Sequence, residues 1–303
     1  MSLLDKHPDR SAVIATSLDW SAAFDRQDPT IVIAKFIKLE VRSSLIPLLS
    51  SYLTDRQMKV KFNGEMSDFL SLVGGNPQGT LLGQLGFIAQ SDDNATTVPL
   101  EDRYKYIDDL SLLHLVLFAD LLSKYDTKNH VPSDIGIDDA YLPTESFKTQ
   151  QDLDRISEWT LENLSLLNEK KCNYMVFSRS QTNISTRLTV NQKTLERVSS
   201  TDMLGMKISS DLSWDRHCQS ICQKAYSRIG MLTKLKYAGV GVEDLVDIYM
   251  LMIRSITEYC SVVFHSSLTL KQRQKLEMIQ KICLRVILGD MYVSYEAALE
   301  MTG

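Results

Sequence analysis

The pair Asp108 and Asp109 is the part of this sequence best suited to chemistry. It stands in the segment YKYIDDLSLL, residues 104–113, where apolar residues flank both carboxylates without an intervening Gly or Pro. This pattern predicts a strand, a tight turn that carries the aspartates, and a returning strand. Two anions at a hairpin tip repel each other, so such a site favours a bound cation. Mg²⁺ is the natural candidate because it prefers carboxylate oxygen and keeps room for water and phosphate oxygens.

Other groups of possible ligands are less persuasive. The pairs Asp92-Asp93 and Asp138-Asp139 lie among polar, turn-forming residues, and we interpret both as solvated loops. Cys218 and Cys222 have helical i,i+4 spacing beside His217, which would allow a zinc site, but a second pair of ligands is not evident. Only Asp108-Asp109 is framed by residues typical of strands.

Strands and helices are expected in a definite order around these carboxylates. Residues 13–20 (VIATSLDW) predict a buried strand that ends in Asp19. Asn63-Gly64 predicts the turn of a hairpin, and the Gly-rich turn GGNPQGT at residues 74–80 leads into an apolar helix. We expect further helices over residues 30–39, 43–53, 81–89, 152–167 and 271–288, and further strands over 57–62, 69–73, 172–177 and 204–208. The strands therefore precede about residue 210, which suggests an α/β body followed by a helical domain.

Length and composition bound the class of protein. A chain of 303 residues with 44% hydrophobic content can form one large domain or two. The sequence has no apolar run near the roughly 18–20 residues that a membrane span needs and no secretory signal pattern. Five scattered cysteines argue against a disulfide scaffold. We therefore expect an intracellular protein without a membrane partner, in the nucleus or the cytoplasm.

Charge is distributed unevenly along the chain. The formal net charge is −5, but residues 92–154 hold fourteen acidic and five basic side chains. Residues 216–285 hold eleven basic side chains against five acidic ones. A basic segment can contact phosphate, although an ordinary solvated helix surface explains the same excess.

Five motifs in order carry a family resemblance. They are LDWSAAFD with Asp19, the turn GNPQGT, KYIDD, NEKKCNYMVF and LGMKISSDLSW. In this order they resemble the reverse transcriptase of non-LTR retrotransposons, of the jockey-like kind, over nearly all of residues 13–290. The resemblance implies an α+β fold: a polymerase palm, with an antiparallel sheet, packed helices and partial fingers, followed by an α-helical thumb. It places the palm at residues 1–210, a remnant fingers insert at about 26–73 and the thumb-like domain at 211–303.

The resemblance also implies roles for single residues. A polymerase transfers a nucleotide from a dNTP to a primer 3′-hydroxyl with two Mg²⁺ ions, for which Mn²⁺ can substitute, and Asp19, Asp108 and Asp109 match their ligands. Lys171 matches a catalytic lysine near the triphosphate. Phe24 matches the aromatic residue under the sugar, and Gln78 and Gly79 match the loop that contacts nucleotide and template. Leu204 and Gly205 match the primer-grip hairpin. Basic residues that could contact the RNA template and DNA primer are Lys224, Arg228, Lys234, Lys236, Lys271, Arg273 and Lys275.

Several of these assignments have simpler alternatives. Phe24 can be a core residue, and Lys171 and the basic residues can be ordinary surface side chains. The sequence also departs from the family pattern, because Asn76 and Glu40 stand where glycine is expected and residues 114–148 form an expanded linker. Only eighteen residues precede Asp19, so we expect an N-terminally truncated element, with a separate fingers and endonuclease segment of the full element as one candidate partner. The sequence leaves open whether Met1 is the true start.

Three classes of function remain open at this stage. The first is an RNA-directed DNA polymerase domain, which the intact carboxylates favour. The second is a catalytically inactive palm–thumb remnant that at most binds nucleic acid, which the missing fingers favour. An unrelated Mg²⁺-dependent phosphotransferase ranks last, because it leaves the other motifs to chance.

Overall fold

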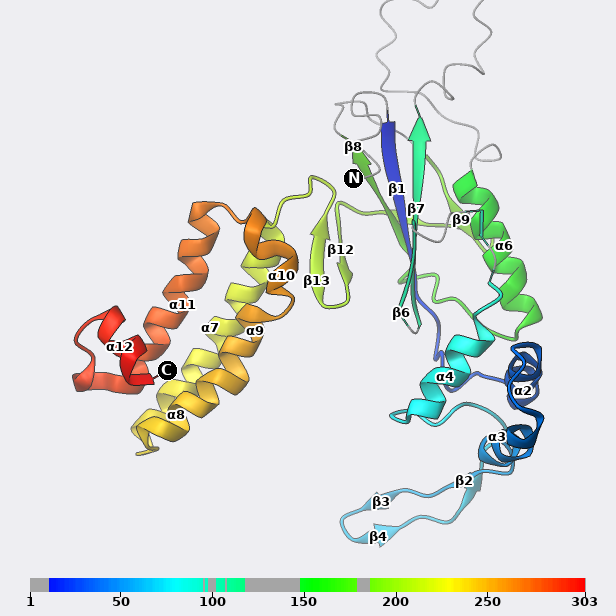
Figure 1. The fold of residues 1–303 in the computed structure, drawn as a ribbon, viewed down its shortest axis with the longest axis horizontal. Coiled ribbons are helices and arrows are strands. Elements are labelled where there is room, and N and C mark those ends of the chain that lie inside the picture. The colour runs from blue at the N-terminus through cyan, green and yellow to red at the C-terminus, as the bar shows by residue number, and fades with distance from the viewer. Residues whose placement is uncertain are drawn as a thin grey trace, which may run out of the picture. The chain divides into compact units, whose positions relative to one another are not determined.

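The computed structural model describes residues 11–94, 96–97, 102–106, 108–117, 148–178 and 186–302. The chain divides into two compact units, Met1–Val198 and Ser199–Gly303. Figure 1 shows the first as a sheet with helices on one face and the second as a hairpin followed by helices. The division falls before the last hairpin of the chain rather than after residue 210, because that hairpin packs on the first helix of the second unit. Each unit is described by itself.

A mostly antiparallel sheet organises the first unit. Among the described residues its order is β11-β8-β1-β7-β6. The central strand β1 (Ser11–Leu18) pairs antiparallel with β7 (Asp109–Leu117) and with β8 (Asn173–Ser178). The edge strands are β6 (Arg103–Tyr106), antiparallel to β7, and β11 (Glu196–Arg197), parallel to β8. A separate two-stranded antiparallel sheet, β9 (Thr189–Val190) and β10 (Lys193–Thr194), comes between β8 and β11 in the sequence.

Two helices cover one face of this sheet, α4 (Leu81–Gln90) and α6 (Lys148–Glu162). Side chains alternate between the two faces of a strand, so every second residue of β1, β7 and β8 points toward these helices. Those residues form one buried cluster with Phe87 of α4 and Trp159 of α6. Its sheet members are Ala12, Ile14, Leu18, Leu110, Leu112, Tyr174 and Val176. The opposite face carries the next residues in each strand, among them Ser17 and Asn173, which pair with each other.

Two further helices extend the unit beyond the sheet. Helix α2 (Pro29–Lys38) begins at Asp28, whose carboxylate accepts the backbone N–H of Thr30 at 2.7 Å. Helix α3 (Ile46–Leu53) follows a short 3-10 turn at Ser43–Leu45. Val32 and Phe36 of α2 pack with Leu49 and Leu53 of α3 and with α4 in a second buried cluster. The expected helices at residues 30–39, 43–53 and 81–89 are thus present.

A two-stranded ribbon connects α3 to the Gly-rich turn. Its strands are β2 (Gln57–Met58), β3 (Lys61–Phe62), β4 (Glu65–Met66) and β5 (Leu70–Ser71), paired as β2-β5 and β3-β4. Asn63 and Gly64 form its turn with φ of 50° and 90°, the left-handed values that a two-residue hairpin turn requires. The predicted turn is therefore confirmed, but the expected strands at 57–62 and 69–73 are replaced by these shorter pairs, and the returning arm already begins at Glu65.

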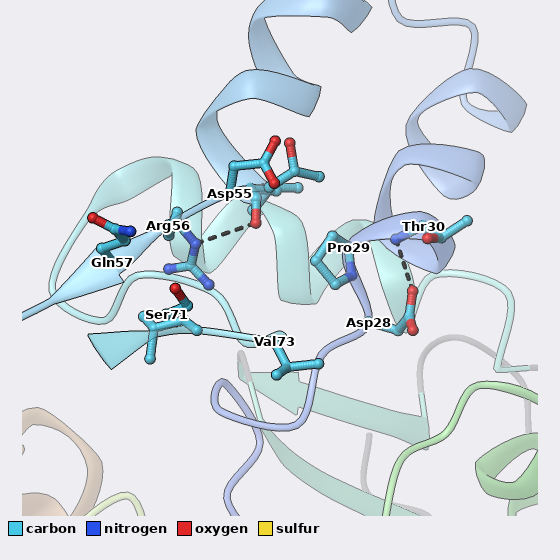
Figure 2. A pocket seen from close by; sticks show the side chains of 11 residues that line it. Asp28, Pro29, Thr30, Asp55, Arg56, Gln57, Ser71 and Val73 are labelled. Atoms are coloured by element: carbon cyan, nitrogen blue, oxygen red, sulfur yellow. Dashed lines mark hydrogen bonds between the residues drawn. The ribbon is translucent and has the colours of Figure 1, made fainter. Parts of the chain in front are cut away.

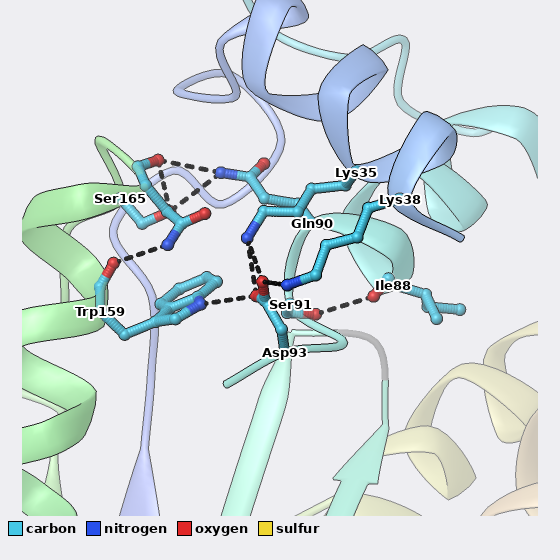
Figure 3. A network of polar contacts seen from close by, with 9 residues as sticks. Lys35, Lys38, Ile88, Gln90, Ser91, Asp93, Trp159 and Ser165 are labelled. Atoms are coloured by element: carbon cyan, nitrogen blue, oxygen red, sulfur yellow. Dashed lines mark hydrogen bonds and ion pairs between the residues drawn. The ribbon is translucent and has the colours of Figure 1, made fainter. Parts of the chain in front are cut away.

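The contacts of Asp93 differ from the solvated loop that we predicted for the pair Asp92-Asp93. Its carboxylate receives Lys35 Nζ at 2.6 Å, Lys38 Nζ at 3.0 Å and the indole N–H of Trp159 at 3.0 Å (Figure 3). Burial alone would raise the pKa of this carboxyl, but the three hydrogen bonds hold it far below its usual range. The loop was predicted to be solvated, which is wrong for Asp93, because this side chain joins α2, the end of α4 and α6. Asp138-Asp139 lies outside the described residues.

Glu40 occupies the position where a glycine was expected. It follows Leu39, the C-cap residue of α2, and has φ of 57°, a left-handed conformation that strains any residue with a Cβ atom. The N–H of the next residue, Val41, donates to Phe36 O at 3.1 Å and closes the end of the helix. The backbone therefore keeps the geometry of a glycine helix terminus although the residue is not glycine.

Glu40→Gly is accordingly expected to stabilise the first unit by about 1 kcal/mol, because the strain of the left-handed residue disappears. Urea denaturation followed by circular dichroism measures the change. Glu40→Ala is the matched control, since it removes the same carboxylate but keeps the Cβ atom, and it should give no such gain. Equal stabilisation by both variants would trace the effect to the lost charge and not to backbone strain.

The second unit begins with a hairpin and continues in helices. The hairpin consists of β12 (Ser200–Met203) and β13 (Met206–Ser209). Helix α7 (Asp215–Tyr237) packs along α11 (Leu270–Leu288), and Leu232, Ile253, Ile279 and Ile287 belong to the buried cluster between the helices. The remaining helices are α8 (Val242–Tyr249), a π-helical turn at Met250–Arg254, α9 (Ser255–Glu258), α10 (Ser261–Phe264) and α12 (Tyr295–Thr302).

The α+β class and the helical C-terminal region are confirmed. One predicted helix has wrong bounds, because α6 spans Lys148–Glu162 and not 152–167. Its C-terminal turn ends at Leu164, which has φ of 50°, and Leu167 instead forms a bridge with Trp20 beyond the end of β1. Of the expected linker 114–148, residues 118–147 lie outside the described residues, and its beginning is the end of β7. In the parts of the chain that are described, every helix is too short or too polar to cross a membrane.

Candidate active site

The strand register brings Asp19 and Asp109 together, although ninety positions separate them in the chain. β1 and β7 pair through Ser17 with Ser111 and through Leu18 with Leu110. The ladder ends at this pair, and extending its register by one step would set Asp19 opposite Asp109. Residues in such opposite positions share a face of the sheet and lie roughly 5 Å apart at Cβ. Successive side chains of a strand point to opposite faces, and Leu18 and Leu110 point toward α4 and α6. The face that carries Asp19 and Asp109 is therefore the one opposite these helices.

Asp108 stands in the turn that joins β6 to β7. Tyr106 and Asp109 are the last pair of this hairpin, so Asp108 lies in the turn between them. Tyr104 and Tyr106 are exposed, and they lie on the face of the sheet opposite α4 and α6. The predicted carboxylate-bearing hairpin is therefore present, with Asp108 at its tip and Asp109 at the first position of the returning strand.

The three carboxylates repel one another. Partial loss of solvent raises the pKa of Asp109 most, and the negative charges of Asp108 and Asp19 raise it further. The positive charge of Lys171 acts in the opposite direction. Asp19, Asp108, Asp109 and Lys171 thus form one electrostatically coupled group at the end of the sheet.

The backbone of Asp19 is held by the segment between α6 and β8. Its N–H lies 3.4 Å from Cys172 Sγ, and its carbonyl accepts the N–H of Asn168 at 2.8 Å. The next residue but one, Ser21, donates to Leu166 O at 2.7 Å. Cys172 is buried, which raises the pKa of its thiol and keeps it in the neutral form. Asp19 is therefore fixed in place by main-chain contacts while its side chain stays one-third exposed.

Lys171 lies on the same segment and faces the carboxylates. Its Nζ is 3.4 Å from Asp19 Oδ2, and its side chain is 65% exposed. An exposed pair of this kind contributes little to stability. The contact places an ammonium group beside the carboxylates, where it can move toward an anionic ligand.

These residues suit a divalent cation in chemistry but do not form a complete set of ligands. Hard ions such as Mg²⁺ bind carboxylate oxygens, and a bound cation would relieve the repulsion among the three aspartates. Across the described ranges of the chain, His, Cys, Asp and Glu side chains do not converge in groups of three or more close enough to hold a metal ion. The metal assignment therefore stays a prediction.

The Gly-rich turn packs against the segment that follows Asp19. Gly75 N–H donates to Gln27 O and Asn76 N–H donates to Phe24 O, both at 2.8 Å. The amide of Gln78 donates to Asp25 Oδ1 at 2.8 Å, with both side chains exposed. The turn that carries Gln78 is therefore fixed to the same chain segment as Asp19.

Phe24 is half-buried and takes part in the core. Its ring lies 5.7 Å from that of Phe87, and it packs against the main cluster of the sheet. Gly79 has φ of 74° and leads into Thr80, which caps α4 by accepting the N–H of Gly83 at 3.1 Å. The contacts of Phe24 fit the core-packing alternative, and a role beneath a sugar stays a prediction.

The other predicted contacts belong to the second unit. Leu204 and Gly205 form the turn of the β12-β13 hairpin with φ of 47° and 79°. Tyr259 donates its hydroxyl to Leu204 O at 2.9 Å, and a Cβ atom on Gly205 would lie 3.2 Å from the Tyr259 ring. The hairpin was expected to place a strand at residues 204–208, but its second strand begins only at Met206.

The predicted basic residues fall into two groups. Lys236 is half-buried, and its Nζ donates to Ile287 O at 2.8 Å near the C-terminal end of α11. Arg273 reaches Ser266 O at 3.4 Å but stays exposed. The others are exposed on α7 or α11: Lys224, Arg228, Lys234, Lys271 and Lys275. Lys236 thus has a structural role at the end of a helix, and the exposed residues remain available to a partner.

The zinc alternative finds no support in the local contacts. Cys218 and Cys222 are free, and loss of solvent raises the pKa of both thiols. His217 accepts the N–H of Lys207 at its Nδ1, at 3.2 Å, and packs between Trp214 and Phe264. Cys218 and Cys222 belong to the buried clusters between the helices, whereas the Nε2 of His217 is buried without a hydrogen-bond partner among the described residues.

No family model matches the sequence, and no curated protein matches it. Among solved structures, apo telomerase of Candida tropicalis, truncated from its C-terminal domain, has 14% identity and a TM-score of 0.43 over 70% of this chain and 36% of that chain. Telomerase of Candida albicans with a fragment of telomeric RNA has 12% identity and a TM-score of 0.44 over 99% and 50%. The chain thus spans half or less of these structures, and a similarity of this degree does not identify a function.

Sequence reasoning missed three residues that support the site. Asp25 accepts the side-chain amide of Gln78, 53 positions away in the sequence. Arg56 donates to the carbonyls of the glycines 18 and 19 positions further on. Cys172 contacts the backbone of Asp19, 153 positions away. Asp25 and Cys172 stand inside motifs that we had quoted, but nothing in their local pattern reveals their partners. Lys105 was also missed; burial and the charge of Arg103 lower its pKa to about 8. It pairs with Leu110, a core residue, and therefore faces away from Asp109.

Proposed function

We propose that this chain is the palm and thumb part of an RNA-directed DNA polymerase, of the kind found in non-LTR retrotransposons. The observation that carries the proposal is the pairing of β1 with β7 up to Leu18 and Leu110, which brings the following Asp19 near Asp109 and Asp108, with Lys171 Nζ 3.4 Å from Asp19. Carboxylates from distant chain positions on adjacent strands are what two-ion nucleotidyl transfer requires. The order of the five sequence motifs supports the same assignment.

Each residue of the group has a defined task in this proposal. Asp19 and Asp108 would hold two Mg²⁺ ions most directly, with Asp109 assisting, and oxygens of the substrate phosphates would complete the ligand sets. When bound, the ions would activate the primer 3′-hydroxyl and neutralise charge on the phosphates. Lys171 would hold a proton at Nζ for the leaving pyrophosphate. Gln78 would contact the dNTP and the template.

The partners follow from this reaction. They are an RNA template, a DNA primer and a dNTP, with a separate fingers segment as a further candidate. Exposed lysines and arginines of α7 and α11 would contact phosphates without reading sequence, so binding should weaken steeply with salt. The alternative is a catalytically inactive palm–thumb remnant that at most binds nucleic acid. It is favoured by the incomplete ligand set of the described carboxylates.

Primer extension on an RNA template with Mg²⁺ tests the proposal. The wild-type chain should extend the primer, and Asp108→Ala/Asp109→Ala should not. Both aspartates lie at a hairpin tip, so the double variant should remain folded. Asp68→Ala, a change at an exposed aspartate of the ribbon, is the matched control and should behave as wild type.

The other outcomes are equally informative. Failure of both folded proteins to extend the primer would favour the inactive remnant, and salt-dependent binding of the template–primer would then measure what function is left. Equal extension by the wild type and the double variant would show that these carboxylates are not needed for the reaction.

A further inference from the structure

Arg56 lies at the base of the ribbon (Figure 2) and contacts three backbone carbonyls. Its Nε donates to Leu53 O, at the C-terminal end of α3, over 3.2 Å. Its Nη2 donates to Gly74 O over 2.9 Å and also to Gly75 O. The guanidinium group presents its donors in a rigid plane, so a single side chain can hold two chain segments in one arrangement.

The Gly-rich turn at residues 74–80, to which Gly74 and Gly75 belong, is held on its other side by the segment after Asp19. Gly75 N–H bonds to Gln27 O, and Asn76 N–H bonds to Phe24 O. Gly75 is buried with φ of 84°, and a Cβ atom there would lie 3.0 Å from Asp25 O. The backbone at Gly75 is therefore held between Arg56 and the segment 24–27, without space for a side chain.

The turn is also tied down beyond this point. Asn76 is 3% exposed, and its Nδ2 donates to Gly83 O at 2.9 Å in α4. Thr80 donates its hydroxyl to Pro77 O at 3.0 Å. These contacts restrain the turn on both sides of Gln78, whose exposed side chain reaches Asp25.

We propose that Arg56 is a positioning residue for Gln78. By holding the carbonyls of Gly74 and Gly75 it keeps the turn pressed against the segment 24–27, and this fixes where Gln78 is presented. Without the guanidinium, both peptide units lose their side-chain donor and can rotate away from Gln27 and Phe24. The part of this inference that concerns nucleotide binding rests on the proposed function, whereas the restraint of the turn does not.

Hydrogen–deuterium exchange tests the restraint directly, whatever the activity of the chain. In Arg56→Ala the amides of Gly75 and Asn76 should exchange about tenfold faster, because the turn opens more often. Amides of β1 should exchange at the wild-type rate. Arg56→Lys should fall between the two, since an ammonium group can reach one or two of the three carbonyls but not all in one plane.

Arg42→Ala is the matched control, because Arg42 is an exposed arginine of the same unit for which the described residues provide no side-chain hydrogen bond or ion pair. It should leave the exchange unchanged. Unaltered exchange at Gly75 and Asn76 in Arg56→Ala would overturn the inference. Equal acceleration in β1 would overturn it too, since Arg56 would then only stabilise the whole unit.

Kinetics tests the consequence for Gln78. In primer extension, Arg56→Ala should raise KM for the dNTP about tenfold with less change in the affinity for template–primer, and Arg56→Lys should recover part of the loss. A role limited to stability would lower the active fraction without changing KM. An unchanged KM for the dNTP would show that Arg56 does not contribute to nucleotide binding. If the wild type fails to extend at all, the proposed function fails, and the exchange experiment still decides whether Arg56 holds the turn.

Discussion

Asp19→Asn is expected to lower the rate of primer extension about a thousandfold, the upper end of what loss of one charge-stabilising group costs, without destabilising the fold. The asparagine side chain has the shape of aspartate, and the backbone at this position is held by Cys172 and Asn168 independently of the carboxylate. The substitution removes a negative charge that Asp109 experiences. Stability should therefore stay equal or rise by no more than about 1 kcal/mol, as expected for partly exposed charges.

Three measurements separate this expectation from a structural defect. Single-turnover extension with excess enzyme gives the rate, and urea denaturation gives the free energy of unfolding. NMR titration gives the pKa of Asp109, which should move down toward its ordinary value when the neighbouring charge is removed. Asp68→Asn, at the exposed ribbon, serves as the control for all three. Extension at the wild-type rate would exclude Asp19 from catalysis, and an unchanged pKa of Asp109 would contradict the proximity of the two carboxylates.

Asp152→Ala is expected to destabilise the first unit by about 3 kcal/mol, the cost of breaking a buried pair by removing one partner. The Asp152 side chain is fully buried. Its Oδ2 lies 3.0 Å from His114 Nε2 and accepts the Thr97 hydroxyl at 2.8 Å, while Oδ1 accepts the Thr97 N–H at 2.6 Å. Truncation would leave these three groups without an acceptor and open a cavity beside β7.

The same carboxylate should make stability depend on acid. Burial alone would raise the pKa of Asp152, but the hydrogen bonds from His114 and Thr97 lower it below the ordinary value. A group whose pKa is lower in the folded state contributes stability above its unfolded pKa of about 4, and this contribution is lost as the pH falls through the folded pKa. The wild type should therefore lose more stability than Asp152→Ala between about pH 5 and pH 2.

Urea denaturation at several pH values checks both statements. Glu158→Ala is the matched control, since it removes an exposed acid from the same helix. The difference between the wild type and Asp152→Ala should be largest near neutral pH and shrink toward acid. A constant difference across this range would mean that the loss comes from packing alone and not from the ionised carboxylate.

The sequence alone was enough for the elements that depend on local pattern. The hairpin at Asp108-Asp109, the turn at Asn63-Gly64 and the strand before Asp19 follow from the alternation of apolar residues and from turn chemistry, which act over a few neighbouring residues. Even the departure at Glu40 was informative, because the expected glycine marked a position whose backbone is left-handed.

Helix limits were less predictable. Apolar spacing continued through Leu164 and Leu167, but α6 ends at Glu162, and the segment beyond it turns back toward Trp20 and Asp19. The gain from pairing with the end of β1 outweighs one more turn of helix. That competition involves residues about 150 positions apart, so a local window does not contain it.

For the candidate site too, some features followed from local sequence patterns and others only from the tertiary structure. Residue types and motif order sufficed to choose Asp19, Asp108, Asp109 and Gln78, because carboxylates framed by strands and a Gly-rich turn are local signals. Only the tertiary structure decided that Asp19 comes near Asp109, that Cys172 holds its backbone and that Arg56 and Asp25 restrain the turn carrying Gln78. It also decided that Asp93 is a half-buried anchor for α2 and α6 and that Lys236 closes a helix. The reason is physical: register, burial and hydrogen-bond partners are set by packing between distant segments, and spacing along the chain does not encode them.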